Sequence, residues 1–249
     1  MLSIEERKEL TSLKQKKYRY KHNKFLVEGV RILEEALTMN KLERLYYTKD
    51  LLSSSRKNQL INNANSKGVS IKKIADKELK GISNTVSTQG VLGIVIMSGN
   101  HRKKIENNCI YLDQIRDPGN VGTIIRTADW FGIHNIVLSQ SSVDPYNPKV
   151  VRSGMGAHFR LIILKDYSLK KIKSSGFTIL AADTKGKPIQ SYFPSKSMKW
   201  CLVMGSEAVG ISKNNRPLVD NYISIPGSGN SDSLNVGVAT GVFLNHLMK

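Results

Sequence analysis

The chain has 249 residues, 40% of them hydrophobic, and a formal net charge of +18 from 38 Lys and Arg against 20 Asp and Glu. This length suits one large domain or two modest ones, and the charge favours a polyanionic partner, although a solubilising surface would also carry it. No apolar stretch approaches the ~18 residues of a membrane span, and the N-terminus lacks a signal-peptide core, so we expect a cytoplasmic protein.

Residues 1–97 are predicted to form a compact α/β domain. Hydrophobic periodicity predicts alternating helices and strands that end on a buried strand. In chain order these are a helix near Ser3–Tyr20, a strand Phe25–Val27, a helix near Gly29–Met39, a strand Leu42–Thr48, a helix Ser54–Ser66, a strand Val69–Ile74, a helix Asp76–Ile82 and a strand Gly90–Met97. The polar residues 98–108 that follow predict a linker.

A dense basic block lies near the N-terminus, interleaved with Tyr18 and Tyr20 and free of acidic residues. Cations meet phosphate and aromatic rings can stack on unpaired bases, so this composition suits RNA. The charged, solvent-facing side of a helix would give the same pattern. The candidate RNA-binding residues are Lys14, Lys16, Lys17, Arg19, Lys21 and Lys24.

Residues 109–249 predict a second domain with a parallel sheet covered on both faces, because apolar, non-alternating strands alternate with helices. The predicted strands are Cys109–Asp113, Ile136–Leu138, Leu161–Leu164, Thr178–Ala182, Trp200–Met204 and Tyr222–Ile225. The predicted helices are Asn120–Phe131, one that contains Val150, Val151 and Met155, and Leu234–Met248. Cys109 and Cys201 are expected to be buried hydrophobes in a reducing cytosol, and the scattered His residues predict no metal site.

Three Gly-, Asn- and Ser-rich segments follow apolar runs of this second domain: Asp117–Arg126, Leu202–Gly210 and Ile223–Ala239. Open parallel sheets bind ligands in this position, and glycines let the backbone approach a ligand closely. The dinucleotide motif G-x-G-x-x-G is absent from the sequence. The P-loop motif is absent too, since Ile211-Ser212 follows the Gly205–Gly210 spacing. The segments therefore predict a site for a different small molecule.

Together these segments resemble the three motifs of the SpoU/TrmH family of RNA 2′-O-ribose methyltransferases, in the SPOUT class. The resemblance covers residues 108–249 and rests on Asn120 with Arg126, Gly205 with Glu207, and Ser233-Leu-Asn235-Val. The N-terminal part, with Phe25-Leu-Val-Glu-Gly29, resembles the substrate-binding domain of many members, which is related to small ribosomal RNA-binding proteins. The resemblance implies S-adenosylmethionine as methyl donor, a deep trefoil knot, and a homodimer through the C-terminal domain.

The resemblance also implies catalytic residues. A positioned cation would favour the alkoxide that develops from a ribose 2′-hydroxyl, and Arg126 is the candidate, with phosphate anchoring or pairing with an acidic residue as the alternative. Asn120 is expected to start the helix like an N-cap and to orient Arg126 or a neighbouring loop. Glu207 would anchor the active site or satisfy backbone donors of its own loop. Ser233 and Asn235 would hold substrate or order the knot, and Ser233 could instead be a plain N-cap.

For the donor, the positions that correspond to the family's main-chain contacts are Gly205, Ile225 and Leu234. Met204 and Pro226 are expected to line the pocket wall, although a Met at a strand end is also typical of ordinary core. Gly227 stands where many members carry Met, and Gly237 replaces a frequent Ser. These two departures leave the local shape of the donor pocket open.

We therefore expect 2′-O-methylation of a ribose in structured RNA. A separate N-terminal RNA-binding domain favours 23S ribosomal RNA over tRNA, and a tRNA 2′-O-methyltransferase is one alternative. A noncatalytic RNA-binding or ribosome-assembly protein is another, but it does not explain why the five candidate catalytic residues occur together. The missing dinucleotide motif disfavours a nucleotide-dependent oxidoreductase.

Overall fold

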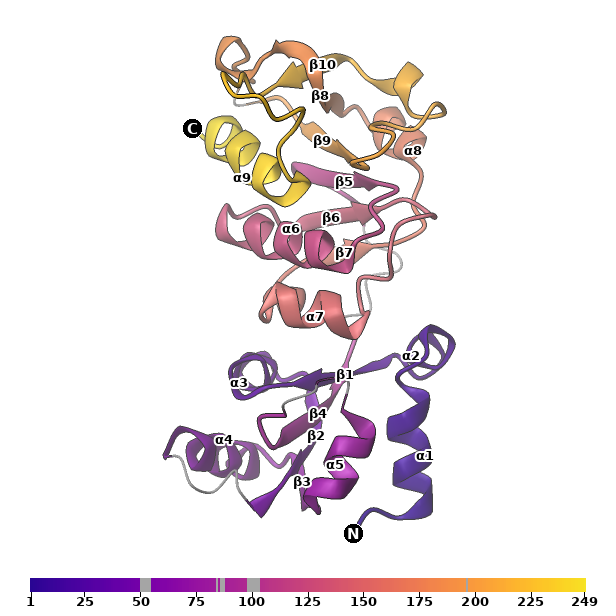
Figure 1. Ribbon diagram of the computed structural model, residues 1–249, viewed down its shortest axis with the longest axis vertical. Helices are drawn as coiled ribbons and strands as arrows, with labels where there is room; N and C mark the ends of the chain where they lie inside the picture. The colour runs from indigo at the N-terminus through magenta and orange to yellow at the C-terminus, as the bar shows by residue number, and fades with distance from the viewer. Residues whose placement is uncertain (50–54, 84, 86–87, 98–103, 196) are drawn as a thin grey trace. The chain divides into compact units, whose positions relative to one another are not determined.

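The structure is a computed structural model that describes the chain except residues 50–54, 84, 86–87, 98–103 and 196, and it divides into two compact units (Figure 1). The first unit comprises Met1–Gly99 and Tyr146–Phe159. The second comprises Asn100–Pro145 and Arg160–Lys249. Most of the predicted linker, residues 98–103, lies outside the described residues. No helix in the described part of the chain is long and apolar enough to cross a membrane.

The first unit is built on a four-stranded mixed sheet in the order β1-β4-β2-β3. Its strands are β1 Lys24–Glu28, β2 Leu42–Tyr47, β3 Ser70–Lys73 and β4 Val91–Ile96. β4 runs antiparallel to β1 and β2, and β3 runs parallel to β2. Two apolar clusters fill the two faces. One lies under α3 (Val30–Thr38) and α4 (Ser55–Ser66), the other under α1 (Ile4–Ser12) and α5 (Asp76–Ile82).

The first predicted helix, Ser3–Tyr20, is wrong in one respect, because the structure divides it into α1 and α2 (Lys16–His22). Leu13 is the C-cap of α1, where the last carbonyls of a helix have no partner within it. The guanidinium of Arg19 donates to the carbonyl oxygens of Leu13 (3.2 Å) and Lys14 (2.7 Å). Arg19 thus stabilises the break between the two helices.

The segment Tyr146–Phe159 completes the core of the first unit although it comes from much later in the sequence. Its helix α7 (Pro148–Gly154) contacts the edge strand β1. The Tyr146 ring lies 5.0 Å from the ring of Phe25 and 6.2 Å from that of Tyr20, and Val151 and Phe159 belong to the same apolar cluster. An edge strand exposes unpaired backbone groups and apolar side chains, and this segment covers part of β1.

The second unit contains a six-stranded, all-parallel sheet in the order β10-β8-β9-β5-β6-β7, which confirms the predicted fold class. The strands are β5 Cys109–Asp113, β6 Asn135–Leu138, β7 Ile162–Leu164, β8 Thr178–Pro188, β9 Trp200–Gly205 and β10 Asn221–Ser224. Helices α6 (Pro118–Trp130) and α9 (Val236–Leu247) pack together on one face, and α8 (Leu169–Ser174) lies on the other (Figure 1).

Strands β5 and β9 pair along their whole length, with Cys109 opposite Cys201 and Asp113 opposite Gly205. Both cysteines are buried and neither forms a disulfide, which confirms the prediction that they are small buried hydrophobic residues. Burial raises the pKa of the Cys201 thiol well above its usual value, and the neighbouring Cys109 raises it further. Because the two strands are adjacent and parallel, the loops after Asp113 and Gly205 begin side by side.

Candidate functional site

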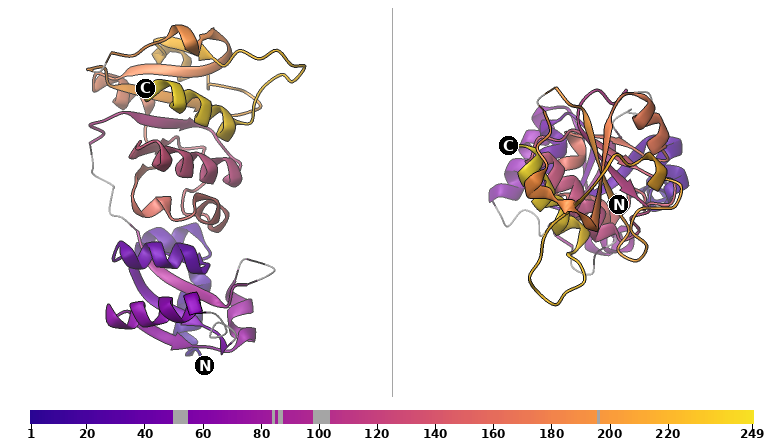
Figure 2. Two further views of the ribbon diagram at one scale, coloured as in Figure 1. Left: turned by 90° about the vertical axis from the view of Figure 1, so that its left-hand side faces the viewer. Right: turned by 90° about the horizontal axis from the view of Figure 1, so that it is seen from above.

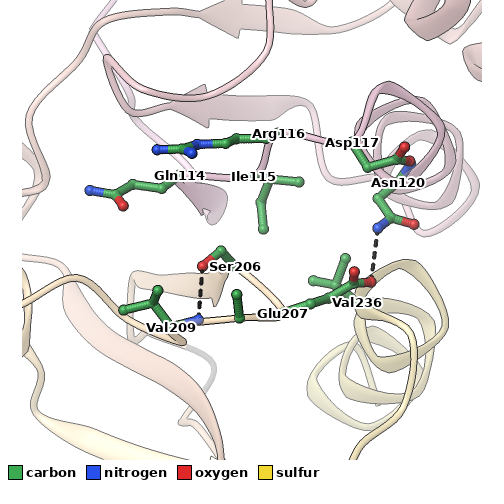
Figure 3. Close-up of a pocket in the computed structure, with 10 residues that line it drawn as sticks. Gln114, Ile115, Arg116, Asp117, Asn120, Ser206, Glu207, Val209 and Val236 are labelled. Atoms are coloured by element: carbon green, nitrogen blue, oxygen red, sulfur yellow. Dashed lines mark hydrogen bonds between the residues drawn. The ribbon is translucent and has the colours of Figure 1, made fainter.

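A cavity of about 240 Å³ lies at the carboxyl ends of β5 and β9 (Figure 3). All three polar segments of the sequence contribute to its wall, at the position where parallel sheets bind ligands. Its lining residues are Gln114, Ile115, Arg116, Asp117, Asn120, Ser206, Glu207, Ala208, Val209 and Val236. Within the described residues, no group of three or more His, Cys, Asp or Glu could hold a metal ion.

Hydrogen bonds between Asn120, Glu207 and Asn235 join the three segments. Asn120 Nδ2 donates to Glu207 Oε1 (2.9 Å), and Asn235 Nδ2 donates to Asn120 Oδ1 (2.8 Å) and to Glu207 Oε1 (3.3 Å). Asn235 Oδ1 accepts from the backbone N–H groups of Gly237 (2.9 Å) and Val238 (3.3 Å), which makes Asn235 the N-cap of α9. Since the oxygen is used by the helix, the amide must turn its donor side toward Asn120 and Glu207.

The residues that cap the starts of α6 and α9 differ from those that the sequence predicted. Asp117 is the N-cap of α6, and its Oδ1 accepts from the backbone N–H of Asn120 (2.8 Å). Asn120, predicted to be cap-like, therefore lies within the first turn, and its side chain bonds Glu207 instead. Asn235 rather than Ser233 caps α9. Ser233 lies in an exposed segment, where its backbone carbonyl accepts from Ser231 Oγ (3.1 Å), and it does not join the cluster.

The turn after β9 holds Glu207 in place. Ser206 and Gly210 bond each other in both directions, with the Ser206 N–H donating at 3.2 Å and the Gly210 N–H at 2.8 Å. A Cβ atom at Gly205 would lie 2.4 Å from the carbonyl carbon of Gly210, so only glycine permits this close return of the chain. Ser206 Oγ also accepts from the Val209 N–H at 3.3 Å (Figure 3).

Arg126 does not line the cavity. It follows Asn120 by six residues on α6, which is about 9 Å along the helix and about 120° around it. Its side chain is exposed and forms no hydrogen bond or ion pair with another side chain in the described part of the chain. Trp130, one helical turn further, is 85% exposed. The structure therefore does not bring Arg126 to the cluster within one chain.

None of the five predicted donor-binding residues lines the cavity, although two of them immediately precede residues that belong to the site. Met204 is 2% exposed and belongs to the core, the alternative that its position left open. Gly205 comes directly before the turn. Ile225, Pro226 and Leu234 lie on the segment between β10 and α9, which is exposed from residue 226 to 235 and extends away from the sheet in both views of Figure 2.

The two unusual glycines have different surroundings. A Cβ atom at Gly237 would lie 2.9 Å from Thr123 Cγ2, so this glycine allows α9 to approach α6 closely. At the next turn, a Cβ atom at Gly241 would lie 3.7 Å from Thr127 Cγ2. Gly227 has no heavy atom within 4 Å of the corresponding position. Gly237 is therefore explained by helix packing, whereas Gly227 lies in open space.

The predicted RNA-binding cations differ in how far they are exposed. The prediction is wrong for Arg19, which is 3% exposed because its guanidinium binds backbone carbonyls. Lys24 is paired with Glu43 (2.8 Å). Lys14 Nζ donates to the backbone carbonyl of Gly81 (3.2 Å). The exposed cations on α2 are Lys16, Lys17 and Lys21.

Sequence reasoning missed Gln114 and Arg116, which both line the cavity. They come directly after the buried Asp113 at the end of β5, and that position was the available signal. The prediction instead weighted the glycine-rich part of the segment, further along the chain.

Comparison with known proteins gives matches to both units. Residues 107–245 match the SpoU rRNA Methylase family, and residues 5–93 match the MRM3-like substrate binding domain. The chain is 28% identical over 244 residues to the 23S rRNA (guanosine(2553)-2′-O)-methyltransferase RlmP of Bacillus subtilis, covering 96% of this chain and 94% of that protein.

Solved structures match over nearly the whole chain as well. A putative RNA methyltransferase of the TrmH family from Porphyromonas gingivalis has a TM-score of 0.83 at 30% identity, covering 99% of this chain and 98% of that one. An AdoMet-bound rRNA methyltransferase from Sinorhizobium meliloti has a TM-score of 0.81 at 28% identity, covering 99% and 95%.

Proposed function

The chain belongs to the SpoU rRNA methylase family, and we propose that it methylates a ribose 2′-hydroxyl of 23S ribosomal RNA, with S-adenosylmethionine (AdoMet) as donor. The observation that carries the proposal is the hydrogen-bonded cluster of Asn120, Glu207 and Asn235 beside the cavity. Similarity to the Bacillus subtilis enzyme over both units supports ribosomal RNA as the substrate, and such a substrate implies a cytoplasmic enzyme.

Residues in the cavity wall and on the segment between β10 and α9 fit AdoMet. Val209 in the wall and Leu234 on that segment expose their apolar side chains, and half-buried Ile225 directly follows β10. Apolar surface of this kind suits an adenine ring, whose polar edges are read by backbone groups. We assign donor binding to the backbone at Gly205, Ile225 and Leu234, with Pro226 beside them. When bound, AdoMet supplies a methyl group that leaves its sulfur as the new carbon–oxygen bond forms.

Arg126 has the charge that the reaction needs. A ribose 2′-hydroxyl is a very weak acid, so a cation beside it stabilises the negative charge that develops on the oxygen. Asn120, Glu207 and Asn235 hold the three segments together around that oxygen, and Ser233 would join them if the segment from residue 226 to 235 closed over the site. A deep trefoil knot in the C-terminal domain is part of this proposal and rests on the family resemblance.

We assign a homodimer to the second unit because α6 and α9 present exposed apolar side chains that a second copy would cover. Trp130, Val238 and Val242 are exposed on these two helices, which pack against each other. Arg126 lies on the same exposed face of α6 as Trp130. In this dimer we assign Arg126 to the cavity of the partner, because it is remote from the cavity of its own chain.

The RNA-binding role belongs to the first unit in this proposal, with residues 1–97 as the substrate-binding domain and residues 109–249 as the catalytic domain. Lys16, Lys17 and Lys21 supply exposed charge on α2. Lys17 Nζ lies 5.8 Å from the ring centroid of Tyr18, so a cation and an aromatic ring are presented together.

Methyl transfer from labelled AdoMet to unmodified 23S ribosomal RNA and to tRNA tests the proposal. We expect label on 23S RNA only, and we expect Arg126→Ala to bind AdoMet normally by calorimetry while losing at least ~100-fold in kcat, as for removal of other groups that stabilise developing charge. Label on tRNA alone would redirect the substrate assignment. Absence of both label transfer and AdoMet binding would contradict the assignment as an enzyme. Unchanged turnover in Arg126→Ala would show that Arg126 does not stabilise the charge on the ribose oxygen.

Trp130→Glu tests the dimer. A carboxylate cannot be buried unpaired at an apolar interface without a large cost, so this variant is expected to sediment as a monomer and to lose activity. Ile4→Glu is the matched control, because Ile4 is also exposed but lies on α1 in the first unit. A Trp130→Glu variant with the wild-type sedimentation coefficient would contradict the assigned interface.

A further inference from the structure

Gln114 and Arg116 occupy the side of the cavity away from the cluster. In Figure 3 their side chains extend from the loop after β5 in the same direction, whereas Asn120 and Glu207 meet at the opposite side. The backbone between them turns the Ile115 side chain the other way, and that side chain is buried. The cavity therefore has two chemically different ends.

The loop that carries Arg116 is held in a fixed conformation. Gln114 adopts a left-handed backbone with φ of 59°, which is uncommon for a residue with a side chain and persists where the surroundings enforce it. Its N–H donates to Ser139 Oγ (2.9 Å), and the carbonyl of Ile115 accepts from the Val143 N–H (2.9 Å). The loop after β6 thus fixes the point from which Arg116 projects.

No ion pair joins Arg116 to either acid that lines the cavity in the described part of the chain. Asp117 Oδ1 caps α6, and Glu207 Oε1 accepts from Asn120 and Asn235. Arg116 itself is exposed, and among the described residues no side chain forms a hydrogen bond or ion pair with it. Among the described residues that line the cavity, it is the only cation. A guanidinium on a fixed backbone, without an internal partner, is suited to binding an external anion.

We propose that Arg116 binds a phosphodiester of the RNA substrate beside the nucleotide that is methylated. The proposal rests on the proposed function, because a ribose presented to this cavity brings its flanking phosphates with it. A guanidinium matches the geometry of two phosphate oxygens through parallel N–H donors. The carboxylate of AdoMet is the other anion of the reaction, but we assign donor binding to the segments after β9 and β10, whereas Arg116 lies after β5.

The salt dependence of RNA binding tests this proposal without requiring turnover. Each lost phosphate contact is expected to lower the slope of log K against log salt concentration by roughly 0.7–0.9. For unmodified 23S RNA, Arg116→Ala should show this smaller slope together with about tenfold weaker binding, while its AdoMet affinity by calorimetry stays at the wild-type value. Arg116→Lys should recover part of the slope, because it keeps the charge but lacks the paired donors.

Two control variants keep this result specific. Gln114→Ala removes a neutral side chain from the same cavity, so its slope should equal that of the wild type. Lys199→Ala removes an exposed cation just before β9, at the amino ends of the parallel strands rather than at the carboxyl ends where the cavity lies, and should leave both affinity and slope unchanged. A reduced slope in either control, or a wild-type slope in Arg116→Ala, would overturn the proposal. Weakened AdoMet binding in Arg116→Ala with unchanged RNA binding would assign Arg116 to the donor carboxylate instead.

A methylphosphonate scan identifies the phosphate. Neutral methylphosphonates are placed one at a time in a short synthetic RNA around the mapped target nucleotide. One position beside the target should weaken binding to the wild type about tenfold and have little effect on Arg116→Ala. Additive losses at every position would contradict a direct contact. If the wild type methylates no RNA, the proposed function fails, and the salt slope still decides whether Arg116 contacts phosphate, because it needs no mapped target.

Discussion

Asn235 uses both ends of one amide, and this explains how a single residue serves two parts of the structure. Its oxygen caps α9, and its nitrogen bonds Asn120 and Glu207. The cap stabilises a helix end whose N–H groups would otherwise lack partners. The nitrogen ties together segments that are far apart in the sequence. The two functions can be separated, because a serine hydroxyl can replace the oxygen that caps α9 but not the nitrogen that bonds Asn120 and Glu207.

Substitution of Asn235 is therefore expected to separate stability from activity. Asn235→Ser keeps an N-cap oxygen, so its free energy of unfolding in urea should lie within about 0.5 kcal/mol of the wild type, while methyl transfer is lost. Asn235→Ala also removes the cap and should lose about 1 kcal/mol of stability. Full methyl transfer by Asn235→Ser would show that the bridge to Asn120 and Glu207 is dispensable.

At this scale the sequence predicted the members of the site better than their orientations. Asn120, Glu207 and Asn235 were expected in one site, and the structure joins them. The N-cap of α9 and the exposure of Arg19 differ from the alternatives that the sequence offered, because the direction of each side chain depends on where the neighbouring helix begins or ends. That boundary is set by which side chain reaches the terminal backbone groups, and several candidates stood within two residues of each other.

Between elements, the packing of α6 against α9 depends on small residues at the contact. Gly237 faces Thr123 and Gly241 faces Thr127, so glycines on one helix lie against threonines on the other. The hydrogen bonds of Asn120 and Asn235 at the starts of these same helices require that close approach. Helix packing and site geometry are therefore linked through one interface.

The variant Gly237→Ala tests this close contact. A Cβ atom 2.9 Å from Thr123 Cγ2 forces the helices or the side chain to shift, which should lower the free energy of unfolding by ~1–3 kcal/mol. The higher helix propensity of Ala should offset up to ~1 kcal/mol of this loss. In a Thr123→Ser background the nearest methyl group is gone, although Thr123 Cβ and Asn235 Oδ1 remain 3.2 Å away, so Gly237→Ala should cost less than in the wild type. Gly227→Ala is the control in open space. Equal effects of Gly237→Ala in both backgrounds by urea unfolding would contradict the contact.

The elements that the sequence predicted are those with a continuous apolar signal. The buried strands from β5 to β10 were all expected, because each is a run of apolar residues. The second half of β8 was missed, since residues 183–188 are mostly exposed and join β10 only after a shift in register. Helix α8 was missed because its six residues bury only Leu169 and Ile172.

For the whole molecule, the described division into two units does not follow the order of the chain. The core of the first unit takes Tyr146, Val151 and Phe159 from a segment that the sequence assigns to the second domain. Sequence periodicity could not reveal this, because it predicts what an element buries but not which distant element covers it. The predicted boundary near residue 97 therefore stays a proposal about folding as well as about function.

A fragment of residues 1–99 is expected to be incompletely folded. Without the Tyr146–Phe159 segment, Phe25 and its neighbours lose part of their apolar cover, and loss of a large core side chain alone costs ~3–5 kcal/mol. The fragment should bind a hydrophobic dye and unfold at a lower urea concentration than the same fragment fused to residues 146–159 through a Gly/Ser linker. Equal urea midpoints for the two proteins would show that the segment is dispensable.

The segment that covers β1 also constrains how such a protein can change by recombination. A single crossover in residues 98–108 between two related genes would join the β1 of one parent to the α7 of the other. The aromatic contacts of Tyr146 with Phe25 and Tyr20 would then have to be matched between sequences that had not diverged together. Exchange of the N-terminal unit is therefore expected to succeed in chimaeras only when residues 146–159 are exchanged with it, so two separate stretches of the gene are inherited as one unit.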